Sequence, residues 1–127
     1  MEYRRLGRSG LQLSELSFGS WITFGNQIED GTSGRLLDMA YDAGINFFDT
    51  ADMYSLGDSE RVVGKALTDY AKRDDFVLAT KAYMPMGDGP NDRGLSRKHL
   101  MSAIDGSLAR LGTDHVDLYQ IHRWDYD

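Results

Sequence analysis

The sequence predicts an α/β fold built on a parallel sheet, and two observations support this prediction. Short apolar runs, which are typical of buried strands, alternate with longer segments whose apolar residues recur every three or four positions, as on one face of a helix. The apolar runs begin at residues 16, 45, 76 and 116, a spacing close to that of a strand–helix–strand unit. Strict alternation of strands and helices favours a parallel sheet with helices packed against it.

The first half of the sequence predicts a β-hairpin, two strands and two helices. Residues 3–14 alternate around a glycine turn and predict the hairpin, and the strands are expected at 16–19 and 45–48. Thr32 or Ser33 is the expected N-cap of the first helix, and Gly44 is its expected C-terminal stop. The second helix is expected to start near Asp58 or Ser59. The apolar residues expected to face inward are Leu36, Leu37, Ala40 and Tyr41, then Val62, Val63, Ala66, Leu67 and Tyr70.

The second half predicts two more strands, at 76–80 and 116–121, separated by a loop and a helix. The loop, residues 84–94, is rich in glycine and proline. Ser96 is the expected N-cap of the helix, and Gly112 is its expected stop. The inward-facing residues expected on this helix are Leu100, Met101, Ile104, Leu108 and Leu111.

Two architectures contain a parallel sheet of this kind: a doubly wound sheet and part of an eight-stranded barrel. A doubly wound dinucleotide-binding sheet needs the pattern Gly-x-Gly-x-x-Gly after its first strand. The segment Phe18-Gly19-Ser20-Trp21 does not supply that pattern. The barrel is therefore the favoured prediction.

Composition argues against several classes of protein. With 41% hydrophobic and 27% charged residues, the chain is expected to be globular rather than disordered. A net charge of −6 without a Lys/Arg block argues against nucleic-acid binding. No apolar stretch reaches the ~18 residues of a membrane helix, so no membrane insertion is expected. The absence of cysteine excludes disulfides and thiolate chemistry, and the cytoplasm is the expected compartment.

Four polar residues lie at or just past the ends of the apolar runs: Asp49, Tyr54, Lys81 and His122. Because the C-terminal ends of parallel strands share one face of an α/β fold, these residues are expected to converge. A Lys–Asp pair beside a tyrosine stabilises the phenolate, as a general acid requires, and a neutral histidine can hydrogen-bond the same carbonyl oxygen. The combination predicts a carbonyl-reducing site, provided that a hydride donor is present.

Other interpretations of these residues are weaker. Taken singly, each of the four has an ordinary structural role, such as a strand-end aspartate that binds loop amides. Asp49, Asp52 and Asp58 suggest carboxylate-pair chemistry such as glycoside hydrolysis, but the last two fit simple turn roles. His99, His115 and His122 lack the spacing of metal ligands, so no metal site is expected.

A set of motifs spread along the chain carries a family resemblance. The motifs are Phe48-Asp49-Thr50-Ala51-Asp52-Met53-Tyr54 followed by Gly57 and Glu60, Thr80-Lys81, Ile121-His122, and the opening Tyr3-Arg4-Arg5-Leu6-Gly7-Arg8-Ser9-Gly10-Leu11. In combination they resemble the aldo-keto reductases, a family of NADPH-dependent (β/α)8 barrels. Two further segments resemble the branch of potassium-channel β-subunits and their bacterial reductase relatives: Trp21-Ile22-Thr23-Phe24-Gly25-Asn26-Gln27 and Arg93-Gly94-Leu95-Ser96-Arg97-Lys98.

The resemblance implies NADPH-dependent reduction of small aldehydes or ketones to alcohols. It implies that Tyr54 is the general acid, that Lys81 and Asp49 tune it, and that His122 orients the carbonyl. The residues implied at the nicotinamide end of the cofactor are Ser20, Trp21, Gln27 and Asp49, and the expected apolar walls of the substrate pocket include Trp21, Met53, Met84 and Trp124. The channel subunits carry Asn at the position of His122, so this histidine favours a reductase. A nucleotide-sensing regulatory subunit with little turnover is the alternative.

The resemblance also implies that the chain is incomplete as a barrel. A (β/α)8 barrel takes ~250 residues, so residues 1–127 are expected to be a single domain, the N-terminal half of the barrel preceded by the hairpin, with the C-terminal half absent. In the family, the segments that grip the cofactor phosphates follow the later strands. The chain alone is therefore expected to be inactive, and its unpaired strand edges are expected to favour a homo-oligomer.

Overall fold

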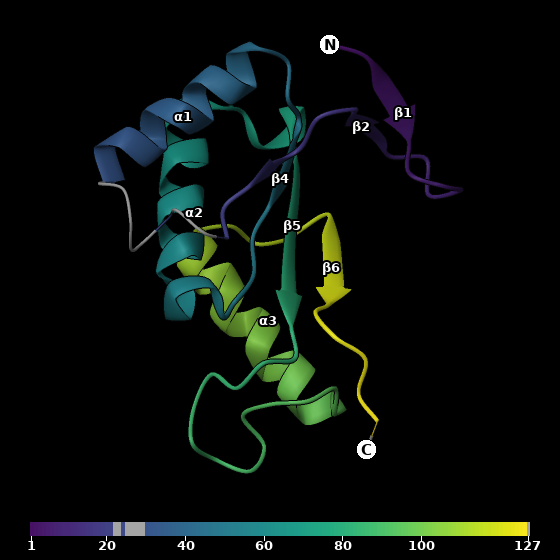
Figure 1. Cartoon of the computed structure of the whole chain (residues 1–127), viewed down its shortest axis with the longest axis vertical. Coiled ribbons are helices and arrows are strands. Elements are labelled where there is room, and N and C mark those ends of the chain that lie inside the picture. Colours follow the sequence, from purple (N-terminus) through teal and green to yellow (C-terminus); the bar gives the residue numbers. More distant parts are fainter. Residues whose placement is uncertain (22–23, 25–29, 127) are drawn as a thin grey trace.

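The computed structural model describes residues 1–21, 24 and 30–126, and Figure 1 shows a parallel sheet with three helices along one side of it. The sheet has the strand order β3-β4-β5-β6, and all three pairings are parallel. The strands are β3 (Phe18–Gly19), β4 (Phe47–Asp49), β5 (Val77–Ala82) and β6 (Leu118–Ile121). The parallel α/β fold predicted from the alternation of strands and helices is confirmed.

A two-stranded antiparallel hairpin precedes the sheet, as predicted, and consists of β1 (Tyr3–Arg5) and β2 (Gln12–Ser14). Its turn places Gly7 and Gly10 at positive φ, which glycine adopts without a steric penalty. Asn46, just before β4, attaches the hairpin to the sheet: its Oδ1 accepts from the Ser14 N–H at 2.8 Å, and its Nδ2 donates to the Gln12 carbonyl at 3.0 Å. The hairpin therefore lies at the end of the sheet where the strands begin.

The helices are α1 (Asp30–Asp42), α2 (Asp58–Tyr70) and α3 (Arg97–Leu111), with short 3-10 helices η1 (Tyr54–Gly57) and η2 (Arg73–Asp75). The predicted ends of α3 are confirmed, because the Ser96 hydroxyl accepts from the His99 N–H at 3.1 Å and Gly112 is left-handed. The predicted cap of α1 is wrong. Thr32 and Ser33 lie inside the first turn of that helix, and the Ser33 side chain is fully buried.

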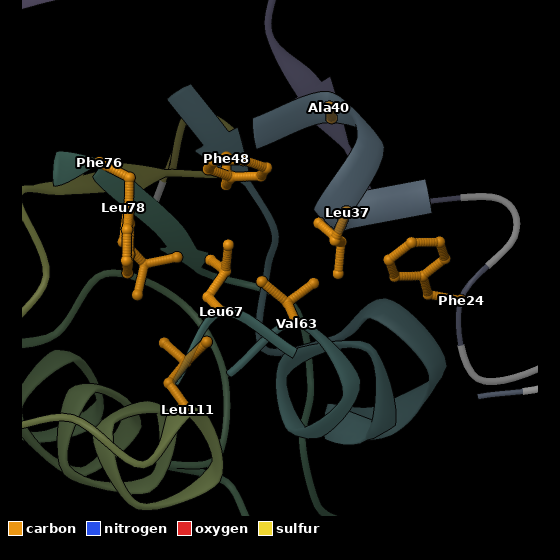
Figure 2. Packing of buried hydrophobic residues seen from close by; sticks show 9 residues of the cluster. All are labelled: Phe24, Leu37, Ala40, Phe48, Val63, Leu67, Phe76, Leu78 and Leu111. Atoms are coloured by element: carbon orange, nitrogen blue, oxygen red, sulfur yellow. The ribbon is translucent and has the colours of Figure 1, made fainter. Parts of the chain in front are cut away.

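The hydrophobic core lies between the helices and one face of the sheet, as Figure 2 shows. Its members are Phe24, Leu37, Ala40, Phe48, Val63, Leu67, Phe76, Leu78 and Leu111. The predictions that Leu36, Tyr70 and Met101 face inward are wrong, because these residues are 39%, 51% and 49% exposed. Leu36 and Met101 each adjoin a more buried leucine of the same stripe, and successive helix positions point about 100° apart. Tyr70 ends α2, and its hydroxyl donates to Asp42 at 2.9 Å.

The opposite face of the sheet carries polar side chains, because successive residues of a strand point to opposite faces. Phe48 pairs with Leu78 on the helix side, and Asp49 pairs with Ala79 on the other side. Further along, Lys81 pairs with Gln120. Strand β5 thus runs through Lys81 instead of ending at Thr80 as predicted, which gives the lysine a rigid backbone. Within the described residues, no helix is both long and apolar enough to cross a membrane.

Candidate active site

The Lys81 ammonium is the centre of the polar group at the carboxyl ends of the strands. It donates to Asp49 Oδ2 at 2.5 Å, to the Thr50 carbonyl at 2.8 Å and to the Tyr54 hydroxyl at 3.3 Å. An ammonium has three hydrogens, and these three acceptors account for all of them. The Lys81 side chain is only 14% exposed. One charge-assisted bond is therefore directed at the phenol oxygen.

Asp49, the last residue of β4, is held from two sides. Its Oδ2 binds Lys81, and its Oδ1 accepts from the Gln120 amide at 3.0 Å. Its carbonyl oxygen accepts from the Ser20 N–H at 3.1 Å, which fixes the backbone as well. The carboxylate is thus a positioned counter-ion to the lysine.

Tyr54 opens the short helix η1, five residues after Asp49, and is 8% exposed. Its ring stacks on Trp21, with centroids 6.2 Å apart and planes at 27°, and meets the His122 ring edge-on at 5.6 Å. The backbone that follows is strained, because Ser55 and Leu56 both have φ of 50°, a region that non-glycine residues seldom adopt. The tyrosine therefore lies on a tight turn between an indole and an imidazole.

His122 directly follows β6, and its N–H donates to the Ala82 carbonyl at 3.0 Å, continuing the strand pairing by one residue. Burial lowers the pKa of the imidazole, and the positive charges of Lys81 and Arg123 lower it further, against an opposing effect of Asp49. The ring is therefore neutral at pH 7 and can donate from one nitrogen. Its Nδ1 is buried without a hydrogen-bond partner in the described structure.

The structure brings together the four residues that the sequence singled out, Asp49, Tyr54, Lys81 and His122. Of the residues assigned to the cofactor, Trp21 beside Tyr54 is 66% exposed, whereas Ser20 is buried and its hydroxyl accepts from Ser59 at 2.7 Å. Gln27 lies outside the described residues. Whether these side chains contact a cofactor stays a prediction.

The expected walls of the substrate pocket differ in exposure. Trp124 is 68% exposed, and Met53 and Met84 are half-buried. Among residues 1–21, 24 and 30–126, no three side chains of the His, Cys, Asp and Glu types come together as metal ligands.

The sequence interpretation missed two features. Gln120 is a polar residue inside an apolar run, two positions before His122 and on the same strand face, and that spacing was the available signal.

Behind the site, fully buried Glu60 accepts from Arg110 Nε and from the Thr80 hydroxyl, both at 2.6 Å. Near it, Asp52 is also fully buried, its two carboxyl oxygens have no partner in the described structure, and burial raises its pKa to about 6. Nothing in the spacing of these residues predicted the cluster.

The sequence pattern of the Aldo/keto reductase family matches residues 15–127. The chain belongs to the aldo/keto reductase family. A crystal structure of a thermostable aldo-keto reductase in complex with the inhibitor epalrestat superposes with a TM-score of 0.84 at 33% identity, over 99% of this chain and 44% of that one. The predicted fold, part of a barrel preceded by a hairpin, is thereby confirmed.

Two plant proteins of this family are also similar to the chain. Each is described as a probable voltage-gated potassium channel subunit beta, one from Oryza sativa subsp. japonica at 48% identity and one from Arabidopsis thaliana at 45%. Each match covers 98% of this chain and 38% of the relative. The chain thus spans about two fifths of the length of these family members.

Proposed function

We propose that the full-length protein reduces aldehydes or ketones to alcohols with NADPH, and that residues 1–127 supply its proton-donating half. The observation that carries the proposal is the Lys81 ammonium, bonded at once to Asp49 and to the Tyr54 hydroxyl. Ion pairs also occur in purely structural networks. Here, however, the lysine of the pair also donates to the hydroxyl of Tyr54, which is a group able to donate a proton to a carbonyl oxygen.

In this proposal, Tyr54 donates its hydroxyl proton to the carbonyl oxygen as that oxygen gains negative charge. Lys81 then stabilises the phenolate that remains, because its N–H already points at the phenol oxygen. Neutral His122, edge-on to the tyrosine ring, donates a hydrogen bond to the same carbonyl oxygen and orients it. The bound cofactor would supply the hydride that reaches the carbonyl carbon.

The donor set fits a nicotinamide cofactor. The exposed indole of Trp21 lies beside the Tyr54 ring and offers an apolar wall, and the Asp49 carboxylate, which shares Lys81 with Tyr54, provides a polar group. We propose these two residues, with Ser20 and Gln27, at the nicotinamide end. Much of the affinity for NADPH should come from its phosphates, which need cationic groups and helix N-termini. In the proposal, those groups belong to the portion of the barrel beyond residue 127.

The alternative function is that of a nucleotide-sensing regulatory subunit with little turnover, and its only support is that two relatives are described as probable potassium channel subunits. Steady-state oxidation of NADPH by the full-length protein, with a panel of aldehydes and ketones, separates the two. Turnover that depends on the carbonyl compound is expected of a reductase, and tight NADPH binding without turnover would establish the alternative.

The 127-residue chain serves as the comparison in the same experiment. Followed by fluorescence, its titration with NADPH should show no tight binding, and it should not turn over substrate. Micromolar or tighter binding by a monomeric 127-residue chain would contradict the placement of the phosphate contacts in the remainder of the barrel.

A further inference from the structure

We propose that Gln120 is a positioning residue of this site, whose amide holds the Asp49 carboxylate in the orientation from which Lys81 serves Tyr54. The proposal rests on the proposed reductase function. Gln120 Nε2 donates to Asp49 Oδ1 at 3.0 Å, while Lys81 Nζ donates to Asp49 Oδ2 at 2.5 Å. Each carboxylate oxygen thus has a partner on a different strand.

The strand register explains why these three side chains meet. Lys81 and Gln120 are direct partners in the parallel pairing of β5 with β6, so both side chains leave the sheet on the same face. Asp49 ends β4 and pairs with Ala79, two residues before Lys81, which puts its carboxylate on that face too. Gln120 therefore extends across β5 to Oδ1 of Asp49, the carboxylate oxygen that Lys81 does not bind.

Two partners are needed because the terminal torsion of an aspartate is broad. With only Lys81 attached, the carboxylate can rotate, and the ammonium can follow it. The bond from Lys81 to the Tyr54 hydroxyl is the longest of the three that the ammonium makes, at 3.3 Å against 2.5 and 2.8 Å. It is therefore the bond most easily lost when the ammonium moves.

The amide suits this role because it donates without carrying charge. A cation at residue 120 would compete with Lys81 for the Asp49 carboxylate, and an anion would repel that carboxylate. A methionine would fill similar space but leave Oδ1 without its donor. Gln120 thus fixes the geometry of the charged pair and adds no charge to it.

The test is made in the full-length protein with Gln120→Met, which removes the donor and keeps the length of the side chain. We expect kcat for carbonyl reduction to fall about 10-fold, as for the loss of a charge-assisted bond that sets reacting geometry. The KM for NADPH and the thermal midpoint should stay near wild-type values. The matched control is Gln12→Met in the hairpin, where the side chain is exposed and only the backbone carbonyl binds Asn46.

Gln120→Glu gives a signature that a merely structural role would not give. A protonated glutamic acid can still donate to Asp49, so kcat should be close to wild type at low pH. Two carboxylates sharing one site repel each other once both are ionised. The kcat of this variant, relative to wild type, should therefore fall toward that of Gln120→Met as pH rises.

Two results would overturn the proposal: a wild-type kcat in Gln120→Met, or a loss of kcat matched by equal losses of cofactor affinity and thermal stability. Absence of any reductase activity in the wild-type protein would refute the proposed function instead. In that case, NMR of the Lys81 ammonium still tests whether Gln120 holds Asp49 and Lys81 in place. Its hydrogens should be protected from solvent exchange in wild type and in Gln12→Met, and exchange faster in Gln120→Met. Unchanged exchange would refute it.

Discussion

The two faces of the four-stranded sheet use alternate residues of the same strands for different purposes. On the helix side, Phe48 and Leu78 are 1% and 2% exposed and belong to the packed core (Figure 2). On the other side, the next residue of β4 is Asp49, and the strands carry an ion pair and an amide. The core face fixes the register of the strands, and the register in turn fixes the distances among the polar groups. The polar groups are held in fixed positions because the hydrophobic core anchors their strands from the helix side.

The largest effect expected from this comparison distinguishes two tyrosines on opposite sides. Tyr54→Phe in the full-length protein should lower carbonyl reduction by about 10²–10⁴-fold, because the ring stays but the transferable proton is lost. Tyr119 lies on the helix side of β6, and its hydroxyl donates to the Leu100 carbonyl at 3.2 Å. Tyr119→Phe should keep activity and lower the free energy of unfolding by about 1 kcal/mol.

Steady-state kinetics and urea denaturation of both variants measure the two effects. NADPH binding, which does not require the proton, should survive in Tyr54→Phe. If Tyr54→Phe retained more than about a tenth of the wild-type rate, against a general-acid contribution of 10²–10⁴, the role given to Tyr54 would be wrong. A similar loss of rate in Tyr119→Phe would show that the two faces are not functionally separate.

A second, smaller effect separates two carboxylates that are three residues apart. Asp49 is held by Lys81 and Gln120, whereas Asp52 is fully buried with both oxygens unpartnered in the described structure. Burial raises the pKa of Asp52 to about 6 from 3.8, and nearby Glu60 adds to the shift. The folded state therefore holds this proton at pH values where the unfolded chain has lost it, so the stability contribution of Asp52 decreases as pH rises from about 4 to about 6.

Asp52→Asn removes the titrating carboxyl group and so tests whether Asp52 lowers the stability of the protein as pH rises. At pH 7.5 the variant should be more stable than wild type by about 1–3 kcal/mol, because wild type must then bury an ionised carboxylate whose pKa is raised, whereas the amide is neutral at every pH. At pH 4 the gain should largely disappear, because wild-type Asp52 is then mostly protonated in the folded state. Chemical denaturation of the full-length protein at both pH values measures the difference. If the free energy of unfolding depended on pH in the same way in wild type and in Asp52→Asn, the pKa of Asp52 would not be raised in the folded protein.

Most local signals and the convergence of the strand ends could be predicted from the sequence, although the N-cap expected for α1 was wrong; individual side-chain contacts between distant elements could not be predicted. Ser96 and Gly112 delimit α3 as expected, because capping acts within one turn of the chain. The four strand-end residues converge as expected, because parallel strands carry their ends to one face. The burial of Asp52 and Glu60 was not predictable, since the partner of Glu60 is Arg110, 50 residues away on α3. Gln120 was overlooked because a single polar residue hardly changes an apolar run.

The smallest expected effect concerns the turn that holds Tyr54 on the polar side. Leu56, two residues after Tyr54 in η1, has φ of 50° and is 73% exposed. It therefore combines an unfavourable backbone conformation with little buried surface. A left-handed conformation costs a non-glycine residue about 1–2 kcal/mol. Glycine avoids this cost but loses more conformational entropy on folding, about 0.5–1 kcal/mol. Leu56→Gly should therefore raise the free energy of unfolding by about 0.5–1 kcal/mol.

Leu16→Gly is the matched control for this change. Leu16 is comparably exposed, at 62%, and is not among the residues with positive φ, so the same substitution relieves no strain there. We expect it to lower the free energy of unfolding by about 0.5–1 kcal/mol, the entropic cost alone. Urea denaturation of the two full-length variants decides the matter. If both substitutions destabilised the protein equally, the turn after Tyr54 would carry no strain, and the tyrosine would be held only by its contacts with Lys81, Trp21 and His122.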